Sequence, residues 1–129
     1  MLEKSSIVKK IYYHDTDAGG IVYYANYLKF LEEGRTEFCF HHGIDKALLG
    51  AQDILFVVAH VDINYKAPAR YLETVEVSTC VEKTGRVSIE FLQQVTRGDK
   101  LLVEARVTWV CVNKELRPRP VPEDIKKLL

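Results

Sequence analysis

The sequence predicts an α+β fold in which a single antiparallel sheet covers one long buried helix. Two patterns lead to this prediction. Four segments in the second half of the chain carry apolar residues at every second position, which is the period of a half-buried strand. One segment before them repeats its apolar residues near the helical period. The chain of 129 residues is long enough to bury one core, so we expect a single domain over residues 1–129.

The first half of the chain is expected to form one strand and one long helix. The stretch IVKKIYYH, residues 7–14, is a weakly alternating first strand. The helix is predicted from about Tyr24 to about His42, and Gly43 supplies a left-handed stop. Gly34 inside the helix costs about 1 kcal/mol relative to alanine, which makes sense where the helix lies close against strands. The residues that recur near the helical period are Tyr27, Leu28, Leu31, Gly34 and Phe38.

The second half of the chain is expected to form an antiparallel meander. Its four strands are VVAHVDINYK (57–66), TVEVSTCVEK (74–83), RVSIEFLQQVT (86–96) and LLVEARVTWVCV (101–112). The connections KTGR and RGDK are short and contain glycine, as hairpin turns do. A further helical turn is expected within residues 44–50, and the tail RPRPVPEDIKKLL is too rich in proline to continue a sheet.

Composition and charge argue against several functional classes. With 18 basic and 18 acidic side chains, the formal net charge is zero, and no bulk attraction to nucleic acid or to a membrane follows. No run approaches the roughly 20 apolar residues of a spanning helix, and the N-terminus lacks the apolar core of a signal peptide, so we expect a cytoplasmic protein. Cys39, Cys80 and Cys111 lie far apart without a CxxC pair, so we expect reduced, partly buried thiols.

The stretch HDTDAGG, residues 14–20, is the candidate functional motif, because it sets two carboxylates one residue apart before two glycines. A DxD after a strand can mark a phosphatase of the haloacid dehalogenase type. That fold needs a strand buried on both faces, and residues 7–14 are too charged for one. A calcium loop needs further oxygen ligands at alternating positions, whereas Ile21, Val22 and Tyr23 follow here. We therefore expect no metal and no other cofactor.

A third interpretation places one carboxylate opposite the N-terminus of the long helix. Gly19 and Gly20 allow the backbone to turn sharply, and the first helical turn near Tyr24 leaves N–H groups unpaired. Unpaired N–H groups and the helix dipole stabilise developing negative charge. A carboxylate facing them can act on a carbonyl group, either as a general base for water or as a nucleophile. This arrangement suits hydrolysis of an activated acyl group.

A family resemblance is carried by DTDAGGIVYYANYLKFLEEGRTEF, by the strand before it, and by APARYLETVEVST with the meander that follows. These segments resemble the 4-hydroxybenzoyl-CoA thioesterase group of hot-dog acyl-CoA thioesterases, including its Tol-Pal-associated branch. The resemblance implies a hot-dog fold, with a five-stranded antiparallel sheet wrapped around the helix. It also implies an enzyme that hydrolyses acyl-CoA to free acid and CoA, with active sites at the interface of a homodimer or homotetramer.

The resemblance further implies roles for individual residues. The catalytic carboxylate falls on Asp17, and the backbone N–H that polarises the thioester carbonyl falls at Tyr24. Many members of the Tol-Pal-associated branch have histidine where this chain has Tyr24; a backbone N–H keeps its role, whereas an imidazole's role in proton transfer is lost. Asp15 is expected to brace the loop, and Asn26 to support it. The residues nominated for substrate binding are Asn26, His60, Lys66, Arg70, Arg86 and Ser88.

Two alternative functions and two alternative catalytic groups are weighed against this interpretation. A non-catalytic hot-dog protein that binds acyl-CoA or acts as a scaffold would not need Asp17, and a hot-dog dehydratase would need a histidine and acid in a motif that is not visible. His14 and Asp15 are neighbours on an expected strand and should point to opposite faces, so His14 is expected at the loop edge. Cys39 lies late in the helix, far from the unpaired N–H groups, so we do not expect it to be a nucleophile.

Overall fold

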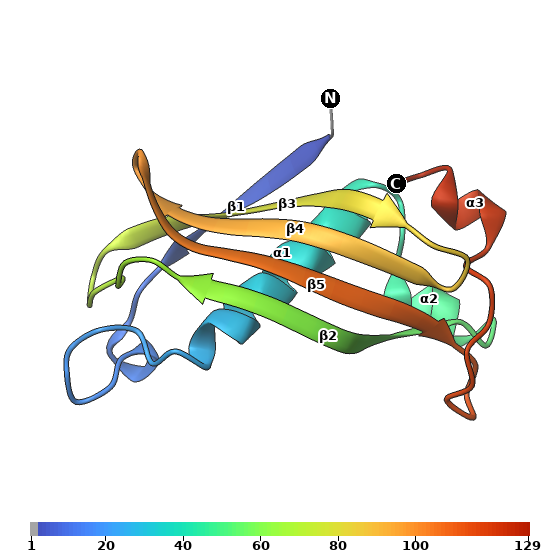
Figure 1. The fold of residues 1–129 in the computed structure, drawn as a ribbon, viewed down its shortest axis with the longest axis horizontal. Helices are drawn as coiled ribbons and strands as arrows, with labels where there is room; N and C mark the ends of the chain where they lie inside the picture. Colours follow the sequence, from blue (N-terminus) through green and yellow to red (C-terminus); the bar gives the residue numbers. More distant parts are fainter. Residues whose placement is uncertain (1–2) are drawn as a thin grey trace.

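The computed structural model describes residues 3–129 (Figure 1). Its strands are β1 (Lys4–Lys10), β2 (Leu55–Tyr65), β3 (Thr74–Thr84), β4 (Ser88–Arg97) and β5 (Lys100–Val112). Its helices are α1 (Asn26–His41), α2 (Lys46–Gly50) and α3 (Glu123–Lys126), and a short 3-10 turn covers Tyr13–Asp15.

The five strands form one antiparallel sheet in the order β1-β3-β4-β5-β2. Consecutive strands β3, β4 and β5 are neighbours in the middle of the sheet, whereas β1 and β2 form its two edges. Helix α1 lies across one face of this sheet and contacts β1 and β3 (Figure 1). The predicted α+β class, with a single antiparallel sheet over one long helix, is confirmed.

Helix α1 buries the face that its apolar residues predict, with one exception. Tyr27, Phe30, Leu31 and Phe38 are all nearly inaccessible to solvent, and their spacing of three, one and seven residues keeps them on one side of a helix. Leu28 is 44% exposed, so its assignment to the predicted face was wrong. Each residue turns the helix by about 100°, which places Leu28 outside the arc that Tyr27, Phe30, Leu31 and Phe38 share.

The predicted helix boundaries need a small correction. Helix α1 begins at Asn26, two residues after the predicted start, and ends at His41. The residues before it form a tighter turn, in which Asn26 N–H donates to the Tyr23 carbonyl at 2.8 Å. Gly43 has a φ of +80°, so the predicted left-handed stop is confirmed. The helical turn expected within residues 44–50 is α2, and the proline-rich tail leaves the sheet to form α3.

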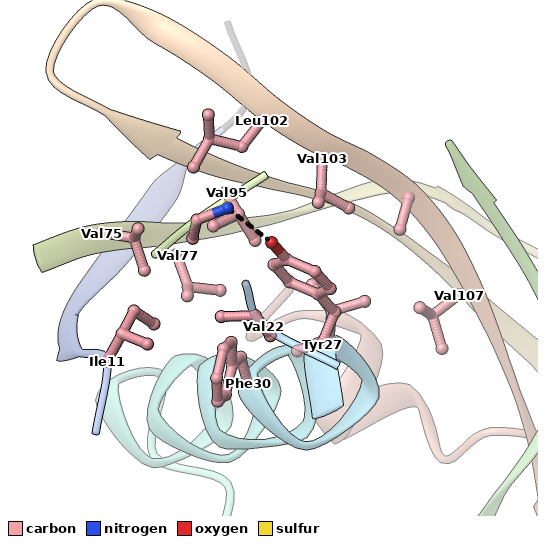
Figure 2. Packing of buried hydrophobic residues seen from close by; sticks show 13 residues of the cluster. Ile11, Val22, Tyr27, Phe30, Val75, Val77, Val95, Leu102, Val103 and Val107 are labelled. Atoms are coloured by element: carbon pink, nitrogen blue, oxygen red, sulfur yellow. Dashed lines mark hydrogen bonds between the residues drawn. The ribbon is translucent and has the colours of Figure 1, made fainter. Parts of the chain in front are cut away.

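Gly34 marks the closest approach of α1 to the sheet. A Cβ at this position would lie 2.9 Å from Thr79 Oγ1 and 3.0 Å from Val77 Cγ1, both on β3. The core extends from this contact in both directions along the helix. One cluster surrounds Tyr27 and Phe30 near the start of α1, and Figure 2 shows it from close by. The other surrounds Phe38 near the end of the helix.

The edge strands depart most from their predicted positions. Strand β1 covers Lys4–Lys10 instead of residues 7–14, because the chain after it enters the 3-10 turn. Strand β2 has the predicted location, but its pairing with β5 shifts in register between Val58 and His60. Ala59 is the extra residue of this bulge, and it breaks the alternation of inward and outward side chains along β2. As a result Val57 and Val58 are both exposed, and the prediction of one continuous apolar face on this strand was wrong.

A buried polar network joins α1 to the sheet, and the sequence did not predict it. Gln93 lies at an inward position of β4 and is completely buried. Its side-chain amide donates to the Thr79 hydroxyl at 2.8 Å and to the Leu31 carbonyl at 2.9 Å, and its oxygen accepts from the Arg35 guanidinium at 3.0 Å. Burial lowers the pKa of Arg35 below its ordinary value.

Candidate functional site

Asp15 connects the acidic loop to the start of α1. Its buried carboxylate accepts a hydrogen bond from Tyr12 N–H at 2.9 Å. Its backbone carbonyl accepts two more, from Tyr23 N–H at 3.0 Å and from the Asn26 side-chain amide at 2.9 Å. Asp15 and Asn26 therefore brace the loop, as the sequence predicted for both.

Asp17 lies at the exposed end of the same loop. Tight backbone hydrogen bonds close the loop around it, from Asp17 N–H to the Ile21 carbonyl (2.9 Å) and from Gly20 N–H to the Asp17 carbonyl (3.0 Å). Gly20 has a φ of +77°, which a residue with a side chain rarely adopts. One carboxylate oxygen of Asp17 accepts from Gly19 N–H at 2.8 Å. The other has no hydrogen-bond donor within residues 3–129, so it can accept a proton or attack a carbon atom.

The start of α1 offers two unpaired N–H groups next to this loop in the chain. Ala25 occupies the N-cap position, where it has no side-chain oxygen to accept a hydrogen bond from the first turn. Within residues 3–129, the N–H groups of Tyr24 and Ala25 have no acceptor. The Tyr24 side chain is 62% exposed and packs against Tyr23, with 4.9 Å between the ring centres. The neighbouring Tyr24 hydroxyl, with smaller effects from burial and from the charge of Asp17, raises the pKa of Tyr23.

A pocket of about 270 Å³ opens between the start of α1 and the end of β2. Its walls are largely apolar and aromatic: Ile21, Val22, Tyr24, Tyr27, Tyr65, Lys66, Ala67 and Pro68. Tyr27 belongs both to this wall and to the core, where its hydroxyl accepts a hydrogen bond from Ala69 N–H at 3.2 Å (Figure 2). Burial raises the pKa of Tyr27 above its ordinary value, so the phenol stays neutral near neutral pH.

Two of the nominated substrate-binding cations lie near this pocket. Lys66 contributes to the pocket wall. Arg70 is exposed and pairs through its backbone with Ile21, which links the loop after β2 to the acidic loop. The structure therefore brings Lys66 and Arg70 close to the segment that carries Asp17.

Three of the nominated residues, Ser88, Arg86 and His60, do not approach Asp17 within one chain. Ser88 on β4 pairs with Val110 on β5, and Val110 pairs in turn with Val57 on β2. Val57 and Tyr65 are eight residues apart on β2, which corresponds to about 26 Å. Arg86 lies at the same far end, where its carbonyl accepts from Val121 N–H. His60 is exposed in the middle of β2, five residues or about 16 Å from Tyr65.

Tyr65 is the site residue that sequence reasoning missed. The alternating pattern predicted only that Tyr65 is an apolar residue of the strand. In the structure its hydroxyl donates to the Tyr24 carbonyl at 3.1 Å, and its ring forms part of the pocket wall. The only signal in the sequence is its place at the end of a strand, directly before a loop that contains proline. This signal does not show which part of the fold the hydroxyl contacts.

The remaining candidate catalytic groups have structural explanations. His14 is exposed and stacks on Tyr12, as expected for a loop-edge residue. The prediction that His14 points away from Asp15 was wrong, because the segment is a 3-10 turn and His14 Nε2 lies 3.5 Å from Asp15 Oδ1. Burial raises the pKa of Cys39 to about 11, so its thiol stays protonated and is a poor nucleophile. Cys80 and Cys111 are also buried and unpaired.

Among residues 3–129, no three histidine, cysteine, aspartate or glutamate side chains converge in a way that could hold a metal ion. In the same part of the chain, no helix has the length and apolar character that crossing a membrane requires.

The fold and the position of this site define a class of protein: a helix enclosed by a five-stranded antiparallel sheet in the hot-dog arrangement. The family model of the thioesterase-like superfamily matches residues 12–129, and the chain belongs to that superfamily. The chain is 39% identical over 118 residues to the acyl-CoA thioester hydrolase YbgC of Escherichia coli. These aligned residues cover 90% of this chain and 88% of that protein.

Solved structures of related proteins have the same fold. A probable thioesterase from Bartonella henselae is 32% identical and superposes with a TM-score of 0.88, covering 93% of this chain and all of its own. The 4-hydroxybenzoyl-CoA thioesterase of a Pseudomonas strain superposes equally well, with a TM-score of 0.88 over 98% of this chain and 99% of its own, at 22% identity. The family resemblance carried by the acidic loop and the predicted hot-dog fold are thus confirmed.

Proposed function

We propose that this protein is an acyl-CoA thioester hydrolase, which converts an acyl-CoA and water into a carboxylic acid and CoA with its thiol restored. The observation that carries the proposal is the placement of Asp17: an exposed carboxylate with one free oxygen, on a loop that hydrogen bonds hold against the start of α1. Membership of the thioesterase-like superfamily and the name of the E. coli relative support the same chemistry.

In the proposed mechanism, the thioester carbonyl lies at the start of α1, with the acyl group in the apolar pocket. The Tyr24 N–H donates a hydrogen bond to the carbonyl oxygen, and the helix dipole stabilises the negative charge that develops there. Asp17 then acts in one of two ways. It removes a proton from the attacking water, or its free oxygen attacks the carbonyl carbon to give a mixed anhydride that water hydrolyses. In both routes the C–S bond breaks and the sulfur leaves as the thiolate of CoA, which is then protonated.

The nominated binding residues are proposed to act in two groups. Lys66 and Arg70, which lie near the pocket, would attract the phosphates of CoA. His60, Arg86 and Ser88 are far from Asp17 in the same chain, so they would contact the substrate only from a second copy. We therefore propose a homo-oligomer, at least a homodimer. The exposed apolar residues Val57 and Val58 on the edge strand β2 support this assembly. The three unpaired thiols fit a reducing compartment such as the cytoplasm.

The test of this function begins with a panel of aliphatic and aromatic acyl-CoAs, followed by release of free thiol. Asp17→Asn keeps the size of the side chain and removes the base or nucleophile, so kcat should fall about 100-fold to 10,000-fold. Binding of a nonhydrolysable acyl-CoA analogue should persist, because the pocket and the helix N–H groups are unchanged. Asp124→Asn, an exposed aspartate of α3 at the other end of the fold, is the matched control and should keep the parent rate.

Two outcomes would contradict the proposal. If Asp17→Asn hydrolyses every substrate at the parent rate, Asp17 is not the catalytic group. If the parent protein binds acyl-CoA but releases no thiol from any member of the panel, the protein is a binder and not an enzyme.

The assembly is tested separately by sedimentation equilibrium at micromolar concentration. The expected result is a dimer or a larger homo-oligomer. A monomer that retains full activity would show that the second copy contributes nothing to the site.

A further inference from the structure

Tyr65 connects the end of β2 to the turn that precedes α1. Its hydroxyl donates a hydrogen bond to the Tyr24 carbonyl at 3.1 Å. Its ring stands edge-on to the Tyr24 ring, with 6.2 Å between centres and an interplanar angle of 87°, and it also packs against Tyr27 at 5.7 Å. Tyr65 is 45% exposed, so hydrophobic burial of its ring stabilises this contact less than burial of a fully enclosed ring would. The contact with the helix start is therefore a specific polar contact as well as part of the pocket wall.

The hydrogen bond acts on a peptide group that carries one of the two unpaired N–H groups. The Tyr24 carbonyl and the Ala25 N–H belong to the same planar trans peptide, so the direction of one determines the direction of the other. The same carbonyl is bound only weakly by the helix itself, since Tyr27 N–H donates to it at 3.4 Å. The Tyr65 hydroxyl is thus the shorter of the two contacts that hold this peptide in place. A hydrogen bond to the carbonyl also polarises the peptide group and strengthens its N–H as a donor.

We propose that Tyr65 is a positioning residue of the thioester-hydrolysing site: through its hydroxyl it sets the orientation of the Tyr24–Ala25 peptide, and with it the Ala25 N–H, the second unpaired donor beside the Tyr24 N–H that binds the developing oxyanion. This inference rests on the proposed function. It differs from a role in the pocket wall, because the wall needs only the aromatic ring and the positioning role needs the hydroxyl. Burial and the neighbouring Tyr24 raise the pKa of Tyr65 above its ordinary value, so its hydroxyl keeps the proton that it donates.

Tyr65→Phe separates the two roles, because it keeps the ring and removes the hydroxyl. Loss of one hydrogen bond that orients transition-state donors should lower kcat about 3-fold to 10-fold, with KM for the same acyl-CoA unchanged. In the amide NMR spectrum, the Ala25 and Tyr24 resonances should shift, while those of β3 and β4 stay in place. Tyr71→Phe is the matched control: Tyr71 is 50% exposed, its ring contacts Tyr13, and its hydroxyl makes no hydrogen bond within residues 3–129. This variant should behave as the parent.

The outcomes distinguish this inference from the proposed function itself. If the parent is active and Asp17→Asn is not, but Tyr65→Phe keeps the parent kcat, only the positioning role is overturned. A rise in KM at unchanged kcat overturns it as well, and assigns Tyr65 to substrate binding. If no acyl-CoA is hydrolysed by the parent, both the proposed function and the positioning role fail.

Discussion

Replacing Gly34 with alanine should destabilise the protein, although alanine is the better helix former. The substitution adds one methyl group at the point where α1 approaches the sheet most closely. That methyl group would lie 2.9 Å from Thr79 Oγ1, 3.0 Å from Val77 Cγ1 and 3.1 Å from Gln93 Nε2. Distances this short require the neighbouring atoms to move. Two of them, on Thr79 and Gln93, hydrogen bond to each other at 2.8 Å inside the buried network.

Three effects determine the magnitude. Helix propensity favours the alanine variant by about 1 kcal/mol. Overpacking of a well-filled core costs about 1–3 kcal/mol. A weakened hydrogen bond between buried groups costs about 1–3 kcal/mol more, because no water replaces it. The costs exceed the gain, and we expect the free energy of unfolding to fall by about 2–3 kcal/mol, which lowers Tm by about 7–11 °C for a chain of this length.

Urea unfolding measures this change directly. Trp109 is the single tryptophan and is buried against Phe91 and Phe56, so its fluorescence reports the loss of the core. The protein concentration must be equal for all variants, because assembly also contributes to stability. Gly50→Ala is the control: it too lies in a helix, but its new Cβ would meet only Leu55 Cδ2 at 3.9 Å. That variant should be as stable as the parent or slightly more so. A Gly34→Ala protein at least as stable as the parent would refute the reasoning.

Three further predictions concern the thiol, metal dependence and the loop. Burial raises the pKa of Cys39 from 9.0 to about 11, so the folded protein holds the thiol proton more tightly than the unfolded chain does. The resulting contribution to the free energy of unfolding is complete below pH 9, and about 2–3 kcal/mol of it should be lost as the pH rises to 11. Cys39→Ala should show a shallower decline in urea unfolding over that pH range, and equal slopes would contradict the assignment. Prolonged chelation should leave thioester hydrolysis unchanged, whereas a loss that a divalent ion restores would favour a metal-dependent loop. Asp15→Asn should lower the free energy of unfolding by about 1 kcal/mol and keep most of the activity; loss of hydrolysis at unchanged stability would assign Asp15 to catalysis.

The main elements of the fold could be predicted because each depends on a local pattern. Helix α1 and the central strands bury residues whose period is visible in a short window of sequence. The close approach of α1 to the strands at Gly34 was predicted because a glycine inside a helix is unfavourable unless close packing requires it. The errors lie where a distant partner decides the structure. The bulge between Val58 and His60 adjusts β2 to β5, and the inward Gln93 is compatible with the core only because Arg35, Thr79 and Leu31 satisfy its polar atoms.

The acidic loop was the predictable part of the candidate site, because its supports lie close together in the sequence. Asp15 and Asn26 are eleven residues apart, and the single hydrogen bond between them lies within the motif that carries the family resemblance. The roles of Asp17 and of the Tyr24 N–H remain predictions, although the structure leaves both groups free to meet a ligand. The pocket could not be predicted in the same way, since half of its wall comes from residues 65–68.

This difference between local and distant supports has a consequence for how substitutions should act. The hydrogen bonds that hold the loop are made to Asp15, by Tyr12 N–H and by the Asn26 side chain. They lie within one continuous segment, so the loss of Asp15 or Asn26 should appear mainly as lower stability. Tyr65 is 41 residues from Tyr24, and its hydroxyl makes its one hydrogen bond to the helix start, while its ring packs against the rings of Tyr24 and Tyr27. Removal of its hydroxyl leaves the loop, the helix and the core contacts intact, so the orientation of one peptide group is all that changes. Substitutions at the contiguous supports should therefore lower Tm at a nearly constant kcat, and the substitution at Tyr65 should lower kcat at a nearly constant Tm.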